Sequence, residues 1–328
     1  MFRKVVKPIA IQLLSSPPVV RLRTRAIKRN SAVTILNLHR VAPFDKSSWP
    51  PLEPKLFEEL LKFLMARFHL TTFQDLEDAQ ASNKPTCVLS FDDGYRDFLI
   101  YAMPILEKFR IKVNQNIIPG CIESGMPPLN VIAQDFVGQA PHELLLKLDV
   151  PSFSPGLKNM DNRESFGRDL SSFLKSQTWE RQVALKEHLL PQFENFLEFK
   201  YSEILSLAEV RQVNEVHEVG MHSYNHANLG IETDEFFQND LDTCRAYSRE
   251  NMGCESEIYA FPNGSYKEHQ IGQTLSAGFK HVLLVGERFS FSNKFVHTRF
   301  NFSANSRQEV VFKAQGGLAA LNGSAKQN

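Results

Sequence analysis

The chain has 328 residues, of which 42% are hydrophobic and 26 are phenylalanine, so it has ample apolar surface for a large buried core. No apolar run reaches the ~18–20 residues of a membrane-spanning helix. The four cysteines include no CxxC pair, which favours free thiols in a reducing compartment. This composition argues against a disordered chain, a spanning helix and a disulfide scaffold.

The net charge of zero conceals an uneven distribution of charge. Residues 1–44 contain nine Lys or Arg residues and no Asp or Glu, which leaves 28 basic and 37 acidic residues in the rest of the chain. An acidic body argues against a nucleic acid as partner.

Residues 1–30 alternate basic and apolar residues around a Ser-Ser-Pro-Pro break. We interpret them as a basic amphipathic arm that either makes peripheral contact with an anionic membrane surface or packs on the body as a helix. The apolar stretch within the arm is short for a secretory signal and lacks a clear cleavage site. We therefore expect the protein in the cytoplasm or at the cytoplasmic face of the membrane.

Strand and helix patterns alternate after the arm. Buried strands are predicted at 32–38, 86–91, 111–118, 217–221 and 257–261, followed by strand candidates at 280–286 and 294–302. Helical spacing predicts helices over 50–68, 96–110 and 234–251. Strand, helix and strand in turn are typical of βαβ units, so we predict an α/β fold with a parallel sheet.

Residues 121–205 interrupt this alternation with mostly helical patterning. Because the strand pattern resumes afterwards, we interpret them as a helical insertion or lid within one domain of residues 31–310. Residues 311–328 are expected to form a flexible tail.

Reactive side chains directly follow several of the predicted strands. His39 follows the first strand, Asp92 and Asp93 follow the strand at 86–91, and His222 and His226 follow the strand at 217–221. In parallel α/β folds the loops at the carboxyl ends of the strands gather on one face. We therefore expect these side chains to meet in one site.

Two adjacent aspartates are an unusual way to end a buried strand, and a metal site would account for them. Two His residues four apart and one Asp form a ligand set that leaves positions open for water and substrate. The second Asp is then free to accept a proton from water whose pKa the metal lowers. Taken singly, the aspartates are also compatible with a turn that caps a helix, and the two His residues with chance.

Three segments resemble, in the expected order, the first three signature motifs of polysaccharide deacetylases, the carbohydrate esterase family 4 or NodB-homology group. They are SFDDG at 90–94, HSYNH at 222–226 and YAFPNGSY at 259–266. The segment ILNLHRV at 35–41 is similar to the strand ahead of the first motif in poly-N-acetylglucosamine deacetylases. The resemblance implies a distorted (β/α) barrel of the NodB-homology type with a helical insertion.

The resemblance also implies roles for individual residues. Asp93, His222 and His226 would bind a divalent metal, most often Zn²⁺, with Co²⁺, Ni²⁺ or Mn²⁺ as alternatives. Asp92 would be the general base. The groups expected to contact the substrate are Tyr95, Pro262 and the backbone N–H of Asn263, the last of these at the oxyanion.

Two of the departures from the family pattern bear on the catalytic residues. Tyr259 stands where many members have an arginine that orients the base, and Arg299 is expected to supply that charge. The Leu-x-His motif that carries the general acid is not recognisable. His297 and His39 are equal candidates for this acid and His281 is a third, although any single His is more often structural.

The predicted function is that of a metal-dependent hydrolase acting on linear amide C–N bonds other than peptide bonds. The resemblance implies removal of N-acetyl groups from amino sugars of a surface polysaccharide, a lipopolysaccharide or a lipid-linked saccharide of the cell envelope. Alternatives are a deformylase or an amidase of non-sugar compounds on the same fold, or an inactive carbohydrate-binding protein. The retained Asp92 argues against the last of these.

Overall fold

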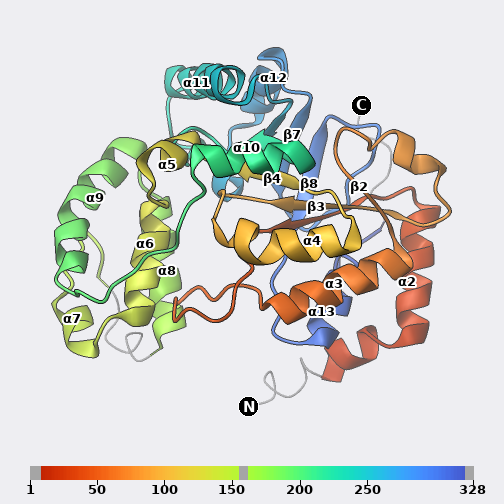
Figure 1. Cartoon of the computed structure of the whole chain (residues 1–328), viewed down its shortest axis with the longest axis horizontal. Helices are drawn as coiled ribbons and strands as arrows, with labels where there is room; N and C mark the ends of the chain where they lie inside the picture. The colour runs from red at the N-terminus through yellow and green to blue at the C-terminus, as the bar shows by residue number, and fades with distance from the viewer. Residues whose placement is uncertain (1–8, 155–161, 322–328) are drawn as a thin grey trace.

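A barrel of parallel strands forms the centre of the protein, with helices around it and a helical lobe on one side (Figure 1). This computed structural model describes residues 9–154 and 162–321. Residues 1–8 of the predicted arm and 322–328 of the predicted tail therefore lie outside the described part of the chain. Within the described part, none of the helices combines the length and the hydrophobicity needed to cross a membrane.

The strands of the sheet are all parallel and close into a ring. Their bounds are β1 Thr34–Leu38, β2 His69–Thr71, β3 Thr86–Phe91, β4 Asn114–Ile117, β5 Glu218–Met221, β6 Ile258–Ala260, β7 His281–Val285 and β8 Val296–Asn301. The ring runs β1, β3, β4, β5, β6, β7 and β8, and β8 pairs again with β1. β2 pairs with the first residues of β3, outside the ring. The predicted distorted (β/α) barrel is confirmed.

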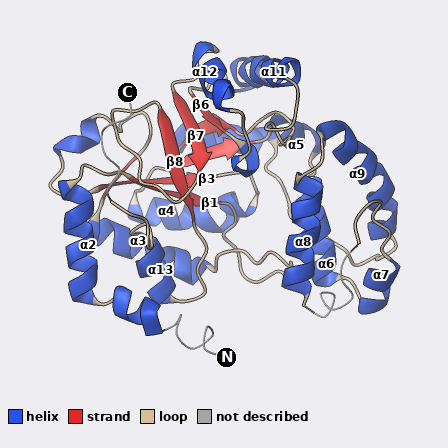
Figure 2. Cartoon of the chain, turned by 180° about the vertical axis from the view of Figure 1, so that it is seen from behind, coloured by secondary structure: helices blue, strands red, loops and turns tan. Residues whose placement is uncertain are grey.

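Helices cover the outside of the barrel (Figure 2). Their bounds are α2 Pro17–Arg29, α3 Pro54–Arg67, α4 Met103–Phe109, α10 Leu207–Val216, α11 Asp234–Met252, α12 Glu268–Ser276 and α13 Arg307–Lys313. The sequence patterns predicted α3, α4 and α11. In the structure, a π-helical turn at Phe98–Ala102 directly precedes α4. The patterns did not predict β2, α10, α12 or α13.

Several helix ends have clear local causes. α3 begins at Pro54, whose fixed φ suits the first helical position. A capping box of Ser206 and Glu209 starts α10. α11 starts after Thr233, whose side chain caps the helix, and ends at Gly253, whose φ of 74° lies in the left-handed region that favours glycine.

The barrel interior changes from apolar to polar along the strands. An apolar cluster that includes Ile35 and Val88 fills one level of the barrel. Because alternate residues of a strand face the same side, the residues two positions further along these strands, Asn37 and Ser90, also face inward. Both are fully buried and bond to Arg299 of β8. This polar layer lies next to the carboxyl ends of the strands.

In its described residues, the segment predicted as an insertion is mostly helical and has an apolar cluster of its own. The helices are α5 Pro119–Ser124, α6 Leu129–Gln139, α7 His142–Lys147, α8 Arg163–Lys175 and α9 Trp179–Glu194. Residues 155–161, which connect α7 to α8, lie outside the described part. α6, α7, α8 and α9 form the lobe beside the barrel in Figure 1.

The loop between β1 and α3, which is the first loop of the barrel, packs between two helices of this lobe. A Cβ atom on Gly138 of α6 would lie 2.0 Å from the carbonyl oxygen of Lys46, and one on Gly167 of α8 would lie 1.9 Å from Ser48 Oγ. The Ser48 hydroxyl also donates to the carbonyl of Gln134 at 2.8 Å. The lobe and the first loop are therefore packed as one unit.

Residues 311–321, which the sequence assigned to the tail, contact the start of the chain. The first three of them complete α13, and Ala314 is fully buried. Arg23 of α2 donates to the carbonyl oxygens of Gln315 and Ala319. The two ends of the described chain thus pack on each other.

Candidate active site

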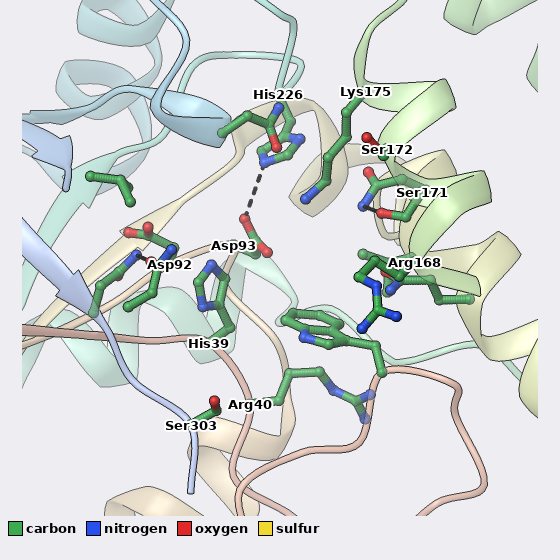
Figure 3. A pocket seen from close by; sticks show the side chains of 18 of the residues that line it. His39, Arg40, Asp92, Asp93, Arg168, Ser171, Ser172, Lys175, His226 and Ser303 are labelled. Atoms are coloured by element: carbon green, nitrogen blue, oxygen red, sulfur yellow. Dashed lines mark hydrogen bonds and ion pairs between the residues drawn. The ribbon is translucent and has the colours of Figure 1, made fainter. Parts of the chain in front are cut away.

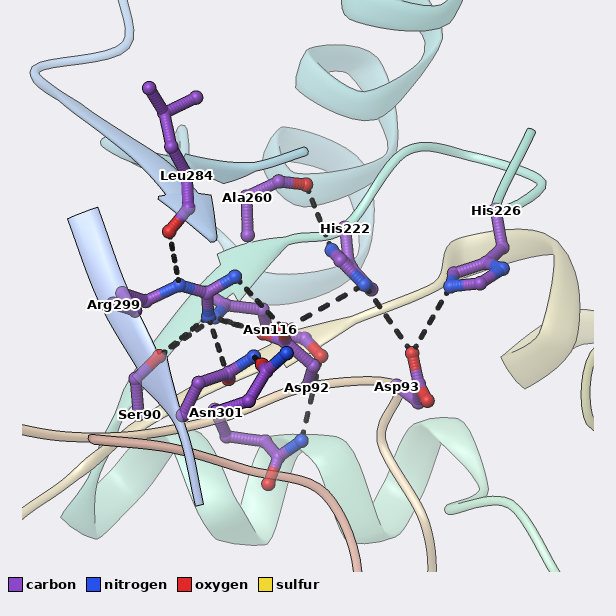
Figure 4. Close-up of polar contacts among 12 residues, drawn as sticks. Ser90, Asp92, Asp93, Asn116, His222, His226, Ala260, Leu284, Arg299 and Asn301 are labelled. Carbon is purple, nitrogen blue, oxygen red and sulfur yellow. Dashed lines mark hydrogen bonds and ion pairs between the residues drawn. The ribbon is translucent and has the colours of Figure 1, made fainter. Parts of the chain in front are cut away.

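Three side chains from the ends of β3 and β5 converge at the rim of the barrel (Figure 4). Asp93 Oδ1 lies 3.4 Å from His222 Nε2 and 3.5 Å from His226 Nε2. All three residues are buried, and one ligand atom from each lies within 4.8 Å of the others. The structure thus brings together the residues predicted as metal ligands.

Unusual backbone conformations aim these side chains. Asp93, Ser223 and His226 have φ values of 76°, 57° and 60°. Non-glycine residues adopt this left-handed region rarely, and they do so mostly where surrounding contacts hold them in place. The turns after β3 and β5 are therefore constrained to present these residues.

Asp240 of α11 holds the histidine loop. Its carboxylate accepts hydrogen bonds from Ser223 Oγ at 2.7 Å, from the Tyr224 N–H at 2.9 Å and from the Tyr259 hydroxyl at 2.6 Å. Burial raises the pKa of Asp240, and the hydrogen bonds oppose that rise. No sequence motif marks Asp240, because it lies inside an amphipathic helix.

The three convergent residues fit a divalent metal ion. The bond of 2.8 Å from His222 Nδ1 to the carbonyl of Ala260 requires a proton on Nδ1, which leaves the Nε2 lone pair facing Asp93. Burial lowers the pKa of His226 to about 3, so its imidazole is neutral as a ligand must be. Asp93 Oδ1 is buried and has no hydrogen-bond donor among the described residues. A cation between these atoms would satisfy that oxygen.

Asp92, the residue before Asp93, forms an ion pair with Arg299. The guanidinium donates two hydrogen bonds, at 2.6 Å to Oδ1 and 2.9 Å to Oδ2, and Asn116 donates a third at 2.8 Å. Burial is the largest single effect and would raise the pKa of Asp92, but the charge and hydrogen bonds of Arg299 together with the charges of His222 and His39 outweigh it and hold that pKa well below its usual range. Asp92 is therefore ionised, as a proton acceptor must be.

A polar network inside the barrel supports this ion pair. Arg299 Nη1 also donates to Ser90 Oγ and to Asn37 Oδ1, each at 3.0 Å. Ser90 in turn donates to Asn114 at 2.6 Å and accepts from Asn116 at 3.1 Å. Polar residues at alternate positions of a buried strand, as in NQNI of β4, were the available signal for this network.

A pocket of about 760 Å³ opens over these residues, a size typical of ligand sites. Loops of the barrel and helix α8 of the lobe form its walls (Figure 3). Its lining residues include His39, Trp49, Asn263, Arg168, Ser172 and Lys175. Burial lowers the pKa of His39, and the charges of Asp93 and Asp92 oppose that shift. His39 therefore lies in the field of both carboxylates.

His297, the other equal candidate for the general acid, does not line this pocket. It is fully buried between Ser290 and His281, with Nδ1 2.8 Å from the Ser290 hydroxyl and Nε2 3.1 Å from His281 Nδ1. Burial lowers the pKa of His297 to about 3. Since it precedes Arg299 by two residues on β8, it faces the same interior roughly 6–7 Å deeper. The structure therefore places His297 and His281 away from the site, contrary to the sequence-based expectation.

Of the residues expected to contact the substrate, one lines the pocket and two do not. Asn263 lines the pocket, in a turn where its φ is 59°. Tyr95 is 1% exposed and lies behind the pocket wall, with its ring edge against Trp49 and Arg40 over its face. Pro262 is buried and does not line the pocket. Tyr95 therefore supports the pocket wall from behind, and Pro262 does not face the pocket.

Comparisons with known proteins agree with this geometry. The family model described as polysaccharide deacetylase matches residues 192–282. A search of curated proteins found no match. The deacetylase PplD of Streptococcus pyogenes, solved with acetate, is 15% identical, with coverage of 87% of this chain and 98% of that one and a TM-score of 0.57.

Two further solved structures share the fold. IcaB from Ammonifex degensii is 17% identical, with coverage of 87% and 97% and a TM-score of 0.56. BC0361, a polysaccharide deacetylase from Bacillus cereus, is 13% identical, with coverage of 87% and 69% and a TM-score of 0.55. The resemblance drawn from the sequence motifs is confirmed: residues 192–282 match the polysaccharide deacetylase model, and the chain has the fold of these solved deacetylases.

Proposed function

We propose that the protein is a metal-dependent N-deacetylase that hydrolyses the acetamido group of an amino sugar. One observation carries the proposal. The carboxylate of Asp92, which Arg299 keeps ionised, lies beside three residues that fit a metal, at the base of an open pocket. A protein that only binds sugars has no use for a second buried carboxylate next to the first.

The metal would be held by Asp93, His222 and His226, and it would polarise the amide carbonyl and make water more acidic. Zn²⁺ is the first choice for two imidazoles and one carboxylate. Asp92 Oδ2 lies 3.8 Å from His222 Nε2, close enough to the ligand set to take the proton of an attacking water. Its low pKa keeps this base ionised throughout the neutral range.

Two pocket residues would complete the reaction. The backbone N–H of Asn263 would donate to the oxyanion that forms when water adds to the carbonyl carbon. His39 would give its proton to the departing nitrogen as the C–N bond breaks, releasing acetate and the free amino sugar. We assign this role to His39 because it lines the pocket, whereas His297 does not.

The resemblance to polysaccharide deacetylases and the pocket support a substrate class. We propose an N-acetylated amino sugar of a surface polysaccharide, a lipopolysaccharide or a lipid-linked precursor of one. The open pocket with Trp49 in its wall suits a sugar ring, since aromatic side chains supply apolar contact area.

The test combines metal content by elemental analysis with acetate release from N-acetylglucosamine oligomers. Wild type and Asp92→Asn should each bind about one metal per chain, and the variant should lose about 10²–10⁴-fold in acetate release. The exposed Asp242→Asn on α11 is the matched control and should equal wild type in both measurements.

The other outcomes are equally informative. Absence of metal from both proteins would show that the two-His, one-Asp site is wrong. Bound metal with release of formate from N-formylated sugars, and no acetate, would identify a deformylase.

A further inference from the structure

Helix α8 of the lobe presents two cations to the pocket. Arg168 and Lys175 are seven residues apart, which places them on one face of the helix two turns apart. Both line the pocket. In Figure 3, Lys175 extends towards Asp93, and Arg168 lies nearer to Arg40.

The other charges that line the base of the pocket already have partners. Arg40 is paired with Asp45, with Asp97 at 3.1 Å and with Asp135 at 3.9 Å. Asp92 is paired with Arg299. Asp93 is the carboxylate that fits the metal. None of these carboxylates is left to neutralise the cations of α8.

Among the residues that the structure describes, Arg168 and Lys175 make no ion pair. Within 9–154 and 162–321, no carboxylate oxygen lies within 4.0 Å of either side chain. Glu164, one turn before Arg168, also lines the pocket but is exposed and does not reach it. Lys175 is half-buried, and burial lowers its pKa although the charge of Asp93 opposes that shift.

An ammonium that is partly removed from water without an ion pair is unfavourable unless an anion joins it. Arg and Lys together suit an oxyanion, because the guanidinium binds two oxygens at once and the ammonium adds a point charge. Ser172, between them on α8, adds a hydroxyl to the same pocket wall. A neutral sugar would leave both cations without a counter-charge.

We propose that Arg168 and Lys175 form a subsite for an anionic group, a phosphate or a carboxylate, carried by the amino-sugar substrate. This inference rests on the proposed deacetylase function and narrows its substrate to acidic or phosphorylated N-acetyl sugars. The insertion would thus select the substrate, while the barrel performs the hydrolysis.

Binding to the metal-free protein tests the subsite without any turnover. Calorimetry would compare N-acetylglucosamine with its 1-phosphate, with its uridine diphosphate ester and with N-acetylmuramic acid. We expect at least one anionic sugar to bind 10-fold or more tightly than N-acetylglucosamine. This preference should fall at least 10-fold in Arg168→Gln/Lys175→Gln and should be unchanged in Arg181→Gln, whose arginine lies in the lobe but outside the pocket.

The order of affinity among the anionic sugars also shows whether the anionic group is a phosphate or a carboxylate. A preference for the phosphorylated sugars indicates a nucleotide- or lipid-linked substrate, and a preference for N-acetylmuramic acid indicates a carboxylated glycan. Equal binding of neutral and anionic sugars, or a preference that survives the double variant, would overturn the proposal.

Acetate release by the metal-loaded enzyme then separates this proposal from the first. The ratio of kcat/KM for the preferred anionic sugar to that for N-acetylglucosamine should fall at least 10-fold in the double variant. If wild type binds the anionic sugar through these residues but releases acetate from none of the sugars, the subsite holds and the deacetylase function fails. If it hydrolyses the neutral sugar best, the subsite fails and the deacetylase function holds.

Discussion

Asp92 is a buried carboxylate whose charge is balanced by a guanidinium from a strand 207 residues further along the chain. Arg299 is itself fully buried, so neither group has water to stabilise it in the absence of the other. Breaking a buried pair by removing one partner is far more costly than the pair is stabilising, because the remaining charge stays uncompensated. This one contact therefore serves both stability and the proposed base.

Arg299→Gln should lower the free energy of unfolding at pH 7 by about 3–5 kcal/mol. The pKa of Asp92 in the folded protein lies below its unfolded value of about 4. The ion pair therefore contributes its stability above pH 4 and loses it as the pH falls through the folded value. The difference between wild type and variant, measured by urea unfolding, should be largest at pH 7 and smaller at pH 3.

The matched control is Arg307→Gln, since Arg307 is 76% exposed and pairs only at the surface, with Glu59. Its unfolding free energy should not differ measurably from wild type at either pH. An equal loss at pH 7 and pH 3 in Arg299→Gln would mean that the arginine acts through packing and not through its charge.

At the level of elements, the contact between the lobe and the first loop of the barrel depends on two glycines. Gly138 and Gly167 leave room for Lys46 and Ser48, and the same loop carries Trp49 into the pocket. The position of α8, and with it the proposed anion subsite, therefore depends on contacts outside the predicted metal site.

Gly167→Ala should lower the free energy of unfolding by about 1–3 kcal/mol, because the new methyl group has no room and forces the loop and helix apart. Gly272→Ala is the matched control, since Gly272 also lies within a helix and has open space where its Cβ would be. It should be neutral or stabilising by up to about 1 kcal/mol. Thermal and urea unfolding measure both, and similar effects of the two substitutions would contradict the close packing.

The strands that carry the predicted metal ligands were predictable because hydrophobic runs and polar ends coincide there. The structure has β3 at Thr86–Phe91, as the sequence predicted, whereas β2 is three residues long and too short to give a pattern. The rule that strand ends meet on one face was sufficient to bring Asp93, His222 and His226 together.

Depth inside the barrel was not predictable in the same way. Alternation shows that His297 and Arg299 share a side of β8, but only the closed ring shows which of them reaches Asp92. The roles of Arg168 and Lys175 depend on how the lobe sits on the first loop, and no local pattern encodes that packing. Asp240 was missed for a similar reason, since α11 has to dock before its carboxylate can meet the loop after β5.

At the level of the whole molecule, α2 separates an inner apolar face from an outer basic face. Val20 and Ile27 are buried, whereas Arg21, Arg25 and Arg29 are exposed. Leu22 lies exposed among these arginines, 66% accessible. Packing on the body and contact with an anionic membrane, the two interpretations of the arm, are thus compatible with each other in this helix.

We expect the protein to bind vesicles that contain phosphatidylglycerol and not vesicles of phosphatidylcholine alone. Each basic residue near an anionic surface contributes about 1 kcal/mol, and the attraction weakens as salt is added. Substituting Arg21, Arg25 and Arg29 by Gln should weaken sedimentation with the anionic vesicles at least 10-fold.

A triple Gln variant at basic positions of the lobe, Arg181, Lys186 and Lys200, controls for the loss of positive charge as such. It should sediment with the anionic vesicles as wild type does. If wild type, the α2 variant and the lobe variant bind the vesicles equally, or if salt does not weaken binding, α2 is not the membrane contact. The proposal that the protein binds a membrane surface through α2 would then be wrong.

The pairing of β8 with β1 has a consequence for synthesis of the chain on the ribosome. β1 is made first and β8 last, so the ring stays open at both edges until residues 296–301 have emerged. Arg299 arrives with that last strand, 207 residues after Asp92, which at usual translation rates is a delay of roughly 10 to 40 s. A nascent chain that lacks β8 already has all three predicted metal ligands but neither the counter-ion of its base nor a closed barrel. On the proposed function, closure of the barrel and the ion pair of the proposed base would therefore be acquired in the same step.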